Sequence, residues 1–328
     1  MKTMTNLTMA AAVALMTLPL GAQEKAAPDL VKMMPAGSGW VISCEWTRVL
    51  TEPVTMKIVE EIFKRPEIHE QLEGFGQMTG LDPRKNITRF CLSGPQVGQE
   101  GLDVIAVEGT FDTEYIKGVL GQFLPQGPAP YRTHGIYQVP DEKGGPANYL
   151  SIPNKSMLLF GREEAVKEAL DVLDGTSKAA AGALVADLQK IDPAALVRLG
   201  VRELDKIKGD PNPIQPHLKN LIGGVLAVKD GVTVTAKAIC DTADAAKEIG
   251  RICDGLLAFA RLQADHERKP DVKILLKLVS PTTVVQNGTE ISASLNVAKT
   301  TLEQIYARVI NKKGEPRGGN AEQDPNSQ

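Results

Sequence analysis

Two hydrophobic patterns alternate along this chain. Some segments carry an apolar residue at every second position, which is typical of strands with one buried face. Others carry apolar residues three or four positions apart, which is typical of helices that cover a sheet. Both patterns recur between residues 39 and 310, separated by turns rich in Gly, Pro, Asn and Asp. The patterning predicts an α+β protein with antiparallel or mixed sheets covered by helices.

In the first half, the patterns predict a strand, a helix, two strands, a helix, three short strands and a final helix. Pro66 interrupts the first helix, and the capping pair Asp112-Thr113 opens the second. These elements lie at 40–46, 54–75, the end of 80–94, 102–110, 112–123, 135–140, 148–152, 156–161 and 162–173.

The second half follows a similar order. A linking helix (179–190) leads into a strand (195–203), a Pro-rich stretch (208–216) and two strands joined at Asp230-Gly231, which is a strong hairpin signal. The next helix opens at Asp241-Thr242. Its apolar residues predict one core stripe, made of residues 249, 252, 253, 256, 257 and 260. Strands at 282–286 and 290–297, a hairpin turn at Asn287-Gly288 and a helix at 299–310 complete the pattern.

The two halves also share a matching segment. The sequence GLDVIAVEGTFDT from Gly101 and the sequence GVTVTAKAICDT from Gly231 agree at Gly, at two strand positions and, after a one-residue gap, at Asp-Thr. Such a pattern also recurs by chance, so the identities alone leave both interpretations open. Because the flanking elements agree in order, we favour two tandem, duplicated units of the ferredoxin-like β-α-β-β-α-β type.

The predicted organisation has six parts. They are a leader (1–22), a linker (23–37), a first α+β repeat (38–175), a linking helix (176–191), a second repeat (192–311) and a tail of disordered composition (312–328).

The leader predicts where the protein works. Lys2 is the only charge before Glu24, and the dozen residues from Met9 to Leu20 are apolar except for one Thr, as in a secretory signal peptide. Cleavage after Ala22 fits best, although Leu20 is larger than the residue usual at that place. An uncleaved anchor is the alternative, but twelve residues reach only about 18 Å across a bilayer core of about 30 Å. We expect an exported protein, periplasmic or secreted and soluble after cleavage, without a later membrane span.

Composition narrows the classes of partner. Removing the leader takes away one Lys and no acid, so the formal net charge changes from -3 to -4. Lys and Arg are interspersed with Asp and Glu along the chain, whereas a nucleic-acid binder needs a concentrated basic face. With two Trp, five Tyr and seven Phe, stacking platforms for sugars or single strands would have very few rings. Nucleic acid is therefore set aside as a partner.

The sequence lacks the motifs of common catalytic and cofactor sites. It contains no Gly-rich dinucleotide or P-loop fingerprint, no nucleophile elbow, no H-E-x-x-H and no C-x-x-C. The four His residues are dispersed, and the cluster Asp265-His266-Glu267 points in three directions if it lies on a helix. Asp241 and Asp244 are carboxylates at a helix start, where they stabilise the helix dipole. We expect no cofactor and no metal.

The four cysteines divide two per half. Cys240 and Cys253 would lie about 16 Å apart along a helix, beyond the limit of about 7 Å between bridged Cα atoms. Cys44 and Cys91 could pair only if their strands are neighbours, which the ferredoxin-like order does not provide. Export makes disulfides possible, yet we favour buried thiols.

One region gathers aromatic side chains. The residues Tyr131, Arg132, His134, Tyr137 and Tyr149 crowd the strands between two Pro- and Gly-rich turns, and they form a possible contact surface. The alternative is that these rings cover the sheet face of the first half.

Two functions remain open from the sequence. The first is a non-catalytic binding or scaffolding protein of the periplasm or cell exterior, which uses a groove between its halves for an unknown protein or small ligand. The second is an enzyme without a recognisable motif, most plausibly a hydrolase with a site at the junction of the halves. The absence of motifs and the scarcity of His favour the first.

Overall fold

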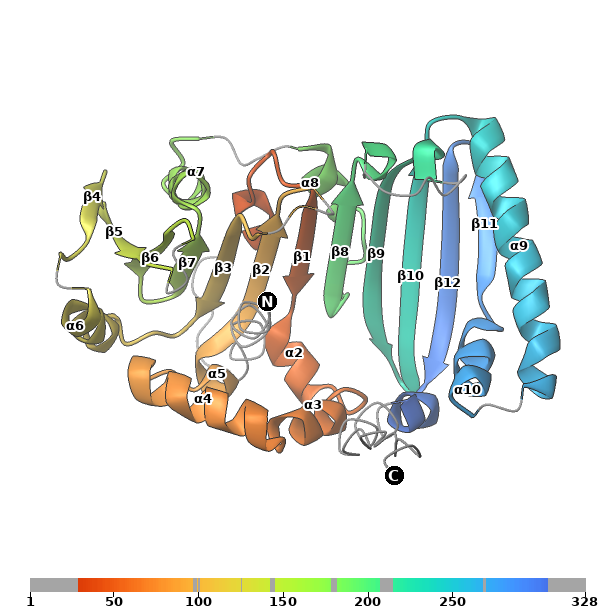
Figure 1. Cartoon of the computed structure of the whole chain (residues 1–328), viewed down its shortest axis with the longest axis horizontal. Coiled ribbons are helices and arrows are strands. Elements are labelled where there is room, and N and C mark those ends of the chain that lie inside the picture. The colour runs from red at the N-terminus through yellow and green to blue at the C-terminus, as the bar shows by residue number, and fades with distance from the viewer. Residues whose placement is uncertain are drawn as a thin grey trace, which may run out of the picture.

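Within the residues that the structure describes, twelve strands form one sheet in the computed structural model (Figure 1). These residues are 29–305 except 97–98, 100, 125, 142–144, 178–181, 207–214 and 268–269, so the predicted leader and tail lie outside them. The strands are β1 (Trp40–Cys44), β2 (Ile87–Gly94), β3 (Val104–Gly109), β4 (Ala129–Tyr131), β5 (His134–Val139), β6 (Asn148–Asn154), β7 (Met157–Gly161), β8 (Val197–Arg202), β9 (Leu218–Val228), β10 (Gly231–Cys240), β11 (Thr283–Asn287) and β12 (Glu290–Ala298).

Helices connect these strands. They are α2 (Trp46–Thr51), α3 (Met56–Phe63), α4 (Pro66–Thr79), α5 (Pro83–Asn86), α6 (Thr113–Phe123), α7 (Glu163–Leu173), α8 (Ala183–Leu188), α9 (Ala243–His266) and α10 (Pro270–Val279), with the 3₁₀ turns η1 (Leu30–Met33), η2 (Leu204–Lys206) and η3 (Gln215–His217). Three of the helices, α2, α5 and α10, were not predicted. Residues 299–305 are also helical. In the described part of the chain, no helix combines the length and the apolar character needed to cross a membrane.

Local signals set the ends of several helices. The carboxylate of Asp112 accepts a hydrogen bond from the backbone N–H of Tyr115 at 3.1 Å and caps α6. The hydroxyl of Thr242 accepts one from the N–H of Ala245 at 3.1 Å and caps α9. Pro66 occupies the first turn of α4, where no intrahelical donor is needed, and so separates α4 from α3.

On either side of the middle of the sheet, five strands follow one another in the same relative order along the chain. The strand order reads β11-β12-β10-β9-β8-β1-β2-β3-β7-β6-β5-β4, and every neighbouring pair is antiparallel. From the centre, β8-β9-β10-β12-β11 follows the path of β1-β2-β3-β7-β6, with α9 and α6 leaving the third strand of each series. The strands of the two halves do not interleave.

The structure corrects two details of the predicted fold. The halves do not have a sheet each, because β1 and β8 pair across the middle and satisfy each other's backbone groups. The pairing is also not ferredoxin-like. In a ferredoxin-like unit, two strands that a helix joins in the chain are separated in the sheet by another strand. Here β1 pairs directly with β2, although four helices connect them in the chain.

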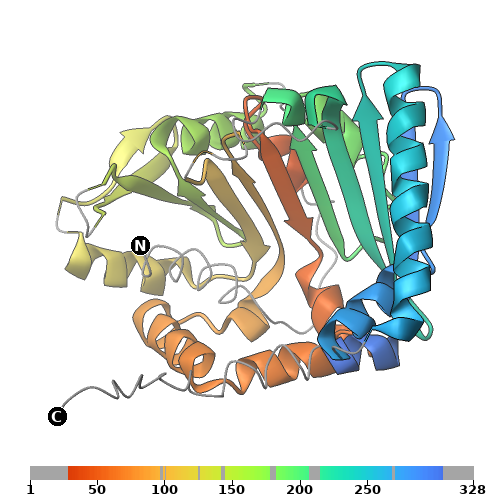
Figure 2. The same ribbon diagram turned by 45° about the vertical axis from the view of Figure 1, so that its right-hand side comes forward.

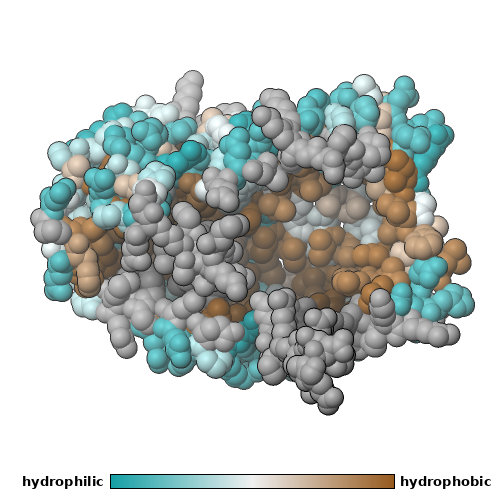
Figure 3. Space-filling model, viewed as in Figure 1, coloured by the Kyte–Doolittle hydropathy of each residue, from teal (hydrophilic) through white to brown (hydrophobic). Residues whose placement is uncertain are grey.

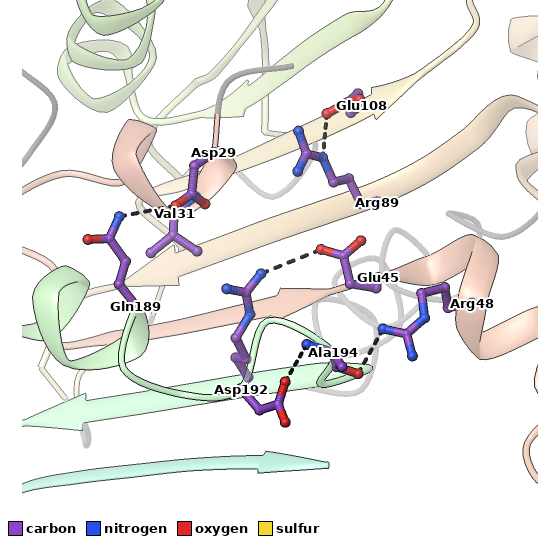
Figure 4. A network of polar contacts seen from close by, with 10 residues as sticks. Asp29, Val31, Glu45, Arg48, Arg89, Glu108, Gln189, Asp192 and Ala194 are labelled. Carbon is purple, nitrogen blue, oxygen red and sulfur yellow. Dashed lines mark hydrogen bonds and ion pairs between the residues drawn. The ribbon is translucent and has the colours of Figure 1, made fainter. Parts of the chain in front are cut away.

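Side-chain contacts also join the halves at this seam (Figure 4). Arg48 donates to the carbonyl oxygen of Ala194 at 2.7 Å, and Gln189 donates to the carboxylate of Asp29 at 3.1 Å. The guanidinium of Arg198 lies 3.5 Å from the carboxylate of Glu45. Each contact links a residue before or after β1 with a residue in or before β8, so the seam is held by more than the strand ladder.

The first half of the sheet is covered on both faces, and the second half is covered only in part. In the first half, η1 and α7 pack on one face, which we call the reverse face, and α2, α3, α4 and α6 pack on the other, which we call the groove face. On the reverse face of the second half, α8 packs against β8 and β9. In the second half, α9 and α10 lie on the groove face near the outer strands. Figure 2 shows α9 standing in front of these strands.

Candidate functional site

The pairing register places side chains of β8, β9, β10 and β12 in transverse rows. Leu199 lies beside Gly223, Gly223 beside Ala236, and Ala236 beside Ala293. Because side chains alternate between the two faces of a strand, every second residue of each strand shares the face of this row. Between Leu221 and Ala227 of β9 and in the stretches that pair with it in β8, β10 and β12, this set is apolar, and we call it the groove floor: Val197, Leu199, Val201, Leu221, Gly223, Val225, Ala227, Val232, Val234, Ala236, Ala238, Ile291, Ala293, Leu295 and Val297.

The groove floor is apolar but only partly covered. On the reverse face of β10 and β12, the intervening residues are mostly polar, as expected of a face in water: Thr233, Thr235, Lys237, Ser292, Ser294 and Asn296. An antiparallel sheet of this kind normally buries its apolar face. Here only Val232, Ile291 and Val297 of the floor are buried, and its other residues are half-exposed.

Helix α9 forms one wall of the space above the floor. Its buried residues Ala246 and Ile249 face the sheet. The Cβ position of Gly250 lies 3.7 Å from Cβ of Gln286, so that flank of α9 faces β11. Phe259 is nine residues further along α9, which turns it by about 180° from Gly250. The Phe259 flank therefore faces away from β11, towards β10 and β9.

This inner flank of α9 carries three exposed apolar side chains. Leu256 is 62% exposed, Phe259 is 59% exposed and Ile252 is 37% exposed. Figure 3 shows apolar side chains gathered around a hollow between α9 and the middle of the sheet. We call the floor and this flank together the groove. Monomeric proteins rarely leave a large contiguous apolar surface in water unless it binds something.

The lower end of the groove is closed by packing. Leu278 of α10 and Leu302 pack with Val54 against the floor residues at the ends of β10 and β12. Arg261 of α9 holds the end of α10 in place, since its guanidinium donates to the carbonyl oxygens of Ser280 at 2.8 Å and Thr282 at 3.1 Å. The wall and the closed end are therefore fixed to each other.

The floor residues and the flank residues Ile252, Leu256 and Phe259 all have uncharged, apolar side chains or none. Near the closed end of the groove, Lys57 and Glu303 are 3.9 Å apart and largely in water. The floor and flank side chains gain free energy from a ligand by burying apolar surface.

The predicted aromatic cluster lies at the other end of the sheet, and four of its five residues contact or approach α7 or the residue after it. The hydroxyl of Tyr131 donates to the carboxylate of Asp171 at 3.0 Å, and Nε of Arg132 is 2.8 Å from the same carboxylate. Nε2 of His134 is 2.9 Å from the carboxylate of Asp174. These contacts hold the β4–β5 ribbon against α7.

Tyr149 and Tyr137 occupy opposite faces of the sheet. Tyr149 hydrogen-bonds Glu163, and burial together with that bond raises the pKa of its phenol. Tyr137 pairs with Leu150 on the groove face and is 7% exposed. The structure thus brings four of the predicted residues together and separates Tyr137 from them. As a contact surface for a partner, the cluster stays a prediction.

Three of the four histidines lie beside acids, each beside a different one. His69 lies 3.2 Å from Glu73, and His217 lies 3.2 Å from Asp241. The hydrogen bond from His217 lowers the pKa of Asp241. This carboxylate therefore binds a side chain in addition to stabilising the helix dipole. In the described ranges, no group of three or more His, Cys, Asp or Glu has a geometry that could hold a metal ion.

A second hollow lies between α3, α4 and α5. It has a volume of about 580 Å³, an apolar floor that includes Met56 and Phe63, and a rim that includes His69 and Arg84. Arg84 is bound to Asp82, with Nε 3.1 Å from the carboxylate. The other basic side chains that line the hollow, Lys64 and His69, each lie beside a different acid.

Sequence reasoning missed the groove because it assigned the whole apolar stripe of α9 to the core. Ile249 and Ala260 are buried as predicted, but Ile252 and Leu256 are exposed. The sequence did contain one indication of this exposure. The apolar residues of α9 are spread around more of the helix circumference than a single sheet edge can cover. The strict alternation in VTVTAKA of β10 likewise indicated one apolar face, without showing whether anything covers it.

Comparisons with known proteins leave the chain without a family. No protein-family model matches it, and no curated protein matches it significantly. Solved structures that resemble it include three crystal forms of TP0453. Form III has 10% sequence identity and a TM-score of 0.46, and the match covers 87% of this chain and 100% of that chain. Form I has 11% sequence identity and a TM-score of 0.42, and the match covers 87% of this chain and 99% of that chain. Form IV has 11% identity and a TM-score of 0.43, with 87% and 97% covered.

Proposed function

We propose that this protein is an exported, non-catalytic binding protein that holds an apolar ligand in the groove. One observation carries the proposal: an apolar sheet face lies uncovered beside the exposed apolar flank of α9. Fully burying a Leu or Phe side chain contributes about 1.5–3 kcal/mol. A ligand that covers both Leu256 and Phe259 therefore gains up to about 3–6 kcal/mol from these two side chains, and each floor residue that it also covers adds to this gain.

The proposal is tested by titrating the protein with N-phenyl-1-naphthylamine, a neutral dye that fluoresces in apolar surroundings. We expect saturable binding to the wild-type protein. Leu256→Asp should weaken it at least tenfold, because the ligand then buries a carboxylate in place of a methyl-rich side chain. The matched control is Val228→Asp, since Val228 is also exposed, at 45%, but lies at the hairpin end of β9 on the reverse face.

Two outcomes would contradict the proposal. One is no binding of the dye by the wild-type protein. The other is equal loss of binding in Leu256→Asp and Val228→Asp, which would place the dye elsewhere. Circular dichroism of each variant shows whether it is folded, so a loss of binding is not mistaken for a loss of structure.

Export is the second part of the proposal, and it rests on the leader. We infer that the mature chain begins at Gln23, because the apolar run from Met9 to Leu20 is too short to span a bilayer and is followed by Gly-Ala. The intact mass of the exported protein tests this inference. A product that retains Met1 would overturn it.

We also infer that the two halves descend from one duplicated unit. The shared strand path on either side of the β1–β8 seam supports this, and so do the matched positions of β3 and β10, each followed by a helix with a polar cap. Superposition of residues 38–175 on residues 192–310 in an experimental structure is the test. If β2, β3 and β7 do not fall on β9, β10 and β12, the inference fails.

A further inference from the structure

The sheet ends in two edge strands, and they differ in how they are protected. At one end, β4 has three residues and contains Pro130, which cannot donate a ladder hydrogen bond. At the other end, β11 has five residues, Thr283 to Asn287, with no proline and no charged side chain. Short length, proline and charge are the devices that keep edge strands from pairing with other chains. β4 is very short and contains a proline. β11 is longer and has neither a proline nor a charged side chain.

The outer side of β11 is open among the described residues. β11 is last in the strand order and pairs only with β12, and Figure 2 shows it as the outermost strand beyond α9. Val285, in its middle, is 62% exposed on the reverse face. An edge of this kind presents unpaired backbone N–H and C=O groups beside a β-branched apolar side chain.

We propose that β11 pairs with β11 of a second copy of this chain, antiparallel and about a two-fold axis through Val285. A two-fold interface must be self-complementary, and this strand satisfies that condition. About such an axis, Thr283 lies opposite Asn287, Val284 opposite Gln286, and Val285 opposite itself. No like charges meet, and a Val–Val pair across two strands is favourable.

Helix α9 makes the interface larger than one short strand. It packs over β11 and β12 on the groove face, so the two-fold axis places the two copies of α9 antiparallel on one face, about 10 Å apart, which is a normal distance between packed helices. The small and exposed residue Ala258 lies on the flank of α9 that turns towards the other copy, whereas Gly250 is buried against β11. A strand of five residues alone buries too little surface for a stable dimer, and the helix pair supplies the remainder.

Charges on the same flank favour a second copy over an unrelated strand. Lys247 and Asp254 lie three residues before and four residues after Gly250, and both are exposed. Because the two helices run in opposite directions about an axis near Gly250, Lys247 of each copy comes within reach of Asp254 of the other. Within the part of the chain that the structure describes, neither side chain forms an ion pair. In the dimer, Lys247 of each copy pairs with Asp254 of the other, so the two-fold axis creates two ion pairs.

The experiment is sedimentation velocity over a concentration series of the mature protein. We expect a reversible dimer. Val285→Lys should raise the dimer dissociation constant at least tenfold by placing two like charges at the axis, whereas the matched control Val228→Lys should leave it unchanged. Lys247→Glu and Asp254→Lys should each weaken the dimer, and the double variant should restore it, because the swap recreates both pairs.

Three results would overturn this proposal. They are a protein that stays monomeric across the series, a dimer that Val285→Lys does not weaken, and a double charge swap that is no better than the single variants. The first result overturns it also when the monomer binds an unrelated strand peptide at β11. Dye binding in the groove is measured on the same samples and is independent of these outcomes.

Discussion

Cys44 and Cys91 show how much depends on which way a side chain points. The prediction that their strands are not neighbours is wrong, because β1 pairs with β2. In that register Ser43 lies opposite Cys91 and Cys44 opposite Phe90. Cys44 therefore packs in the groove-face core, and Cys91 packs in the reverse-face core. All four cysteines are free thiols, and the alternation of faces keeps these two apart.

The thiols predict a dependence of stability on pH. Burial raises the pKa of all four thiols above the ordinary 9.0, with Glu45 adding to the effect at Cys44 and Asp29 at Cys91. A group whose pKa is raised by folding stabilises the fold below its unfolded pKa and loses this contribution as pH rises through the folded value. We expect the free energy of unfolding to fall between about pH 8 and pH 10.

Denaturant titrations at several pH values measure this fall. Labelling of the native protein with iodoacetamide provides a second measurement, in which Cys253, which is half-buried, reacts first and Cys44 and Cys91 react only after unfolding. Labelling of Cys91 as fast as Cys253 would contradict the burial that underlies the prediction.

At the scale of single elements, α9 performs two tasks with different parts of its surface. Ala246, Ile249 and Ala260 anchor it to the sheet, and Leu256 and Phe259 remain in water beside the groove. A helix of 24 residues that contacts the sheet along only one side holds its position through these few anchors and through Arg261. Its own helical propensity then affects the stability of the whole molecule.

Gly255 offers a direct test of that dependence. It lies in the interior of α9, and a Cβ added there meets no atom within 4 Å. Because Gly is less favourable than Ala in a helix interior, Gly255→Ala should stabilise the protein by about 1 kcal/mol. The contrasting variant is Gly231→Ala, where the new Cβ would press on the backbone of Val297 and should destabilise. Chemical denaturation measures both, and a destabilised Gly255→Ala would contradict the open surroundings of that position.

At the scale of the whole molecule, the seam between β1 and β8 makes one structure of two halves. Ile42 pairs with Leu199 at its centre, and the contacts of Arg48, Gln189 and Arg198 cross it. Neither half has its own closed sheet, so unfolding one half exposes an edge of the other. The physical consequence is coupling of their stabilities.

We therefore expect a single cooperative unfolding transition. Both tryptophans, Trp40 and Trp46, lie in the first half, so their fluorescence reports on that half, whereas far-ultraviolet circular dichroism reports on both. The two signals should give the same denaturant midpoint. A circular dichroism curve with a second step that the fluorescence lacks would show that the second half unfolds independently.

The sequence by itself determined the elements of this protein but not their assembly. Hydrophobic period, Pro66 and the capping residues at Asp112 and Thr242 are local, so most helices and strands were predictable from neighbours in the chain, whereas α2, α5 and α10 were not predicted. The β1–β8 pairing, the single sheet and the opposite faces of Cys44 and Cys91 depend on contacts between distant residues, and only the tertiary structure decided them. The groove follows the same rule: the apolar character of Leu256 and Ala236 is written in the sequence, but their exposure depends on where α9 packs.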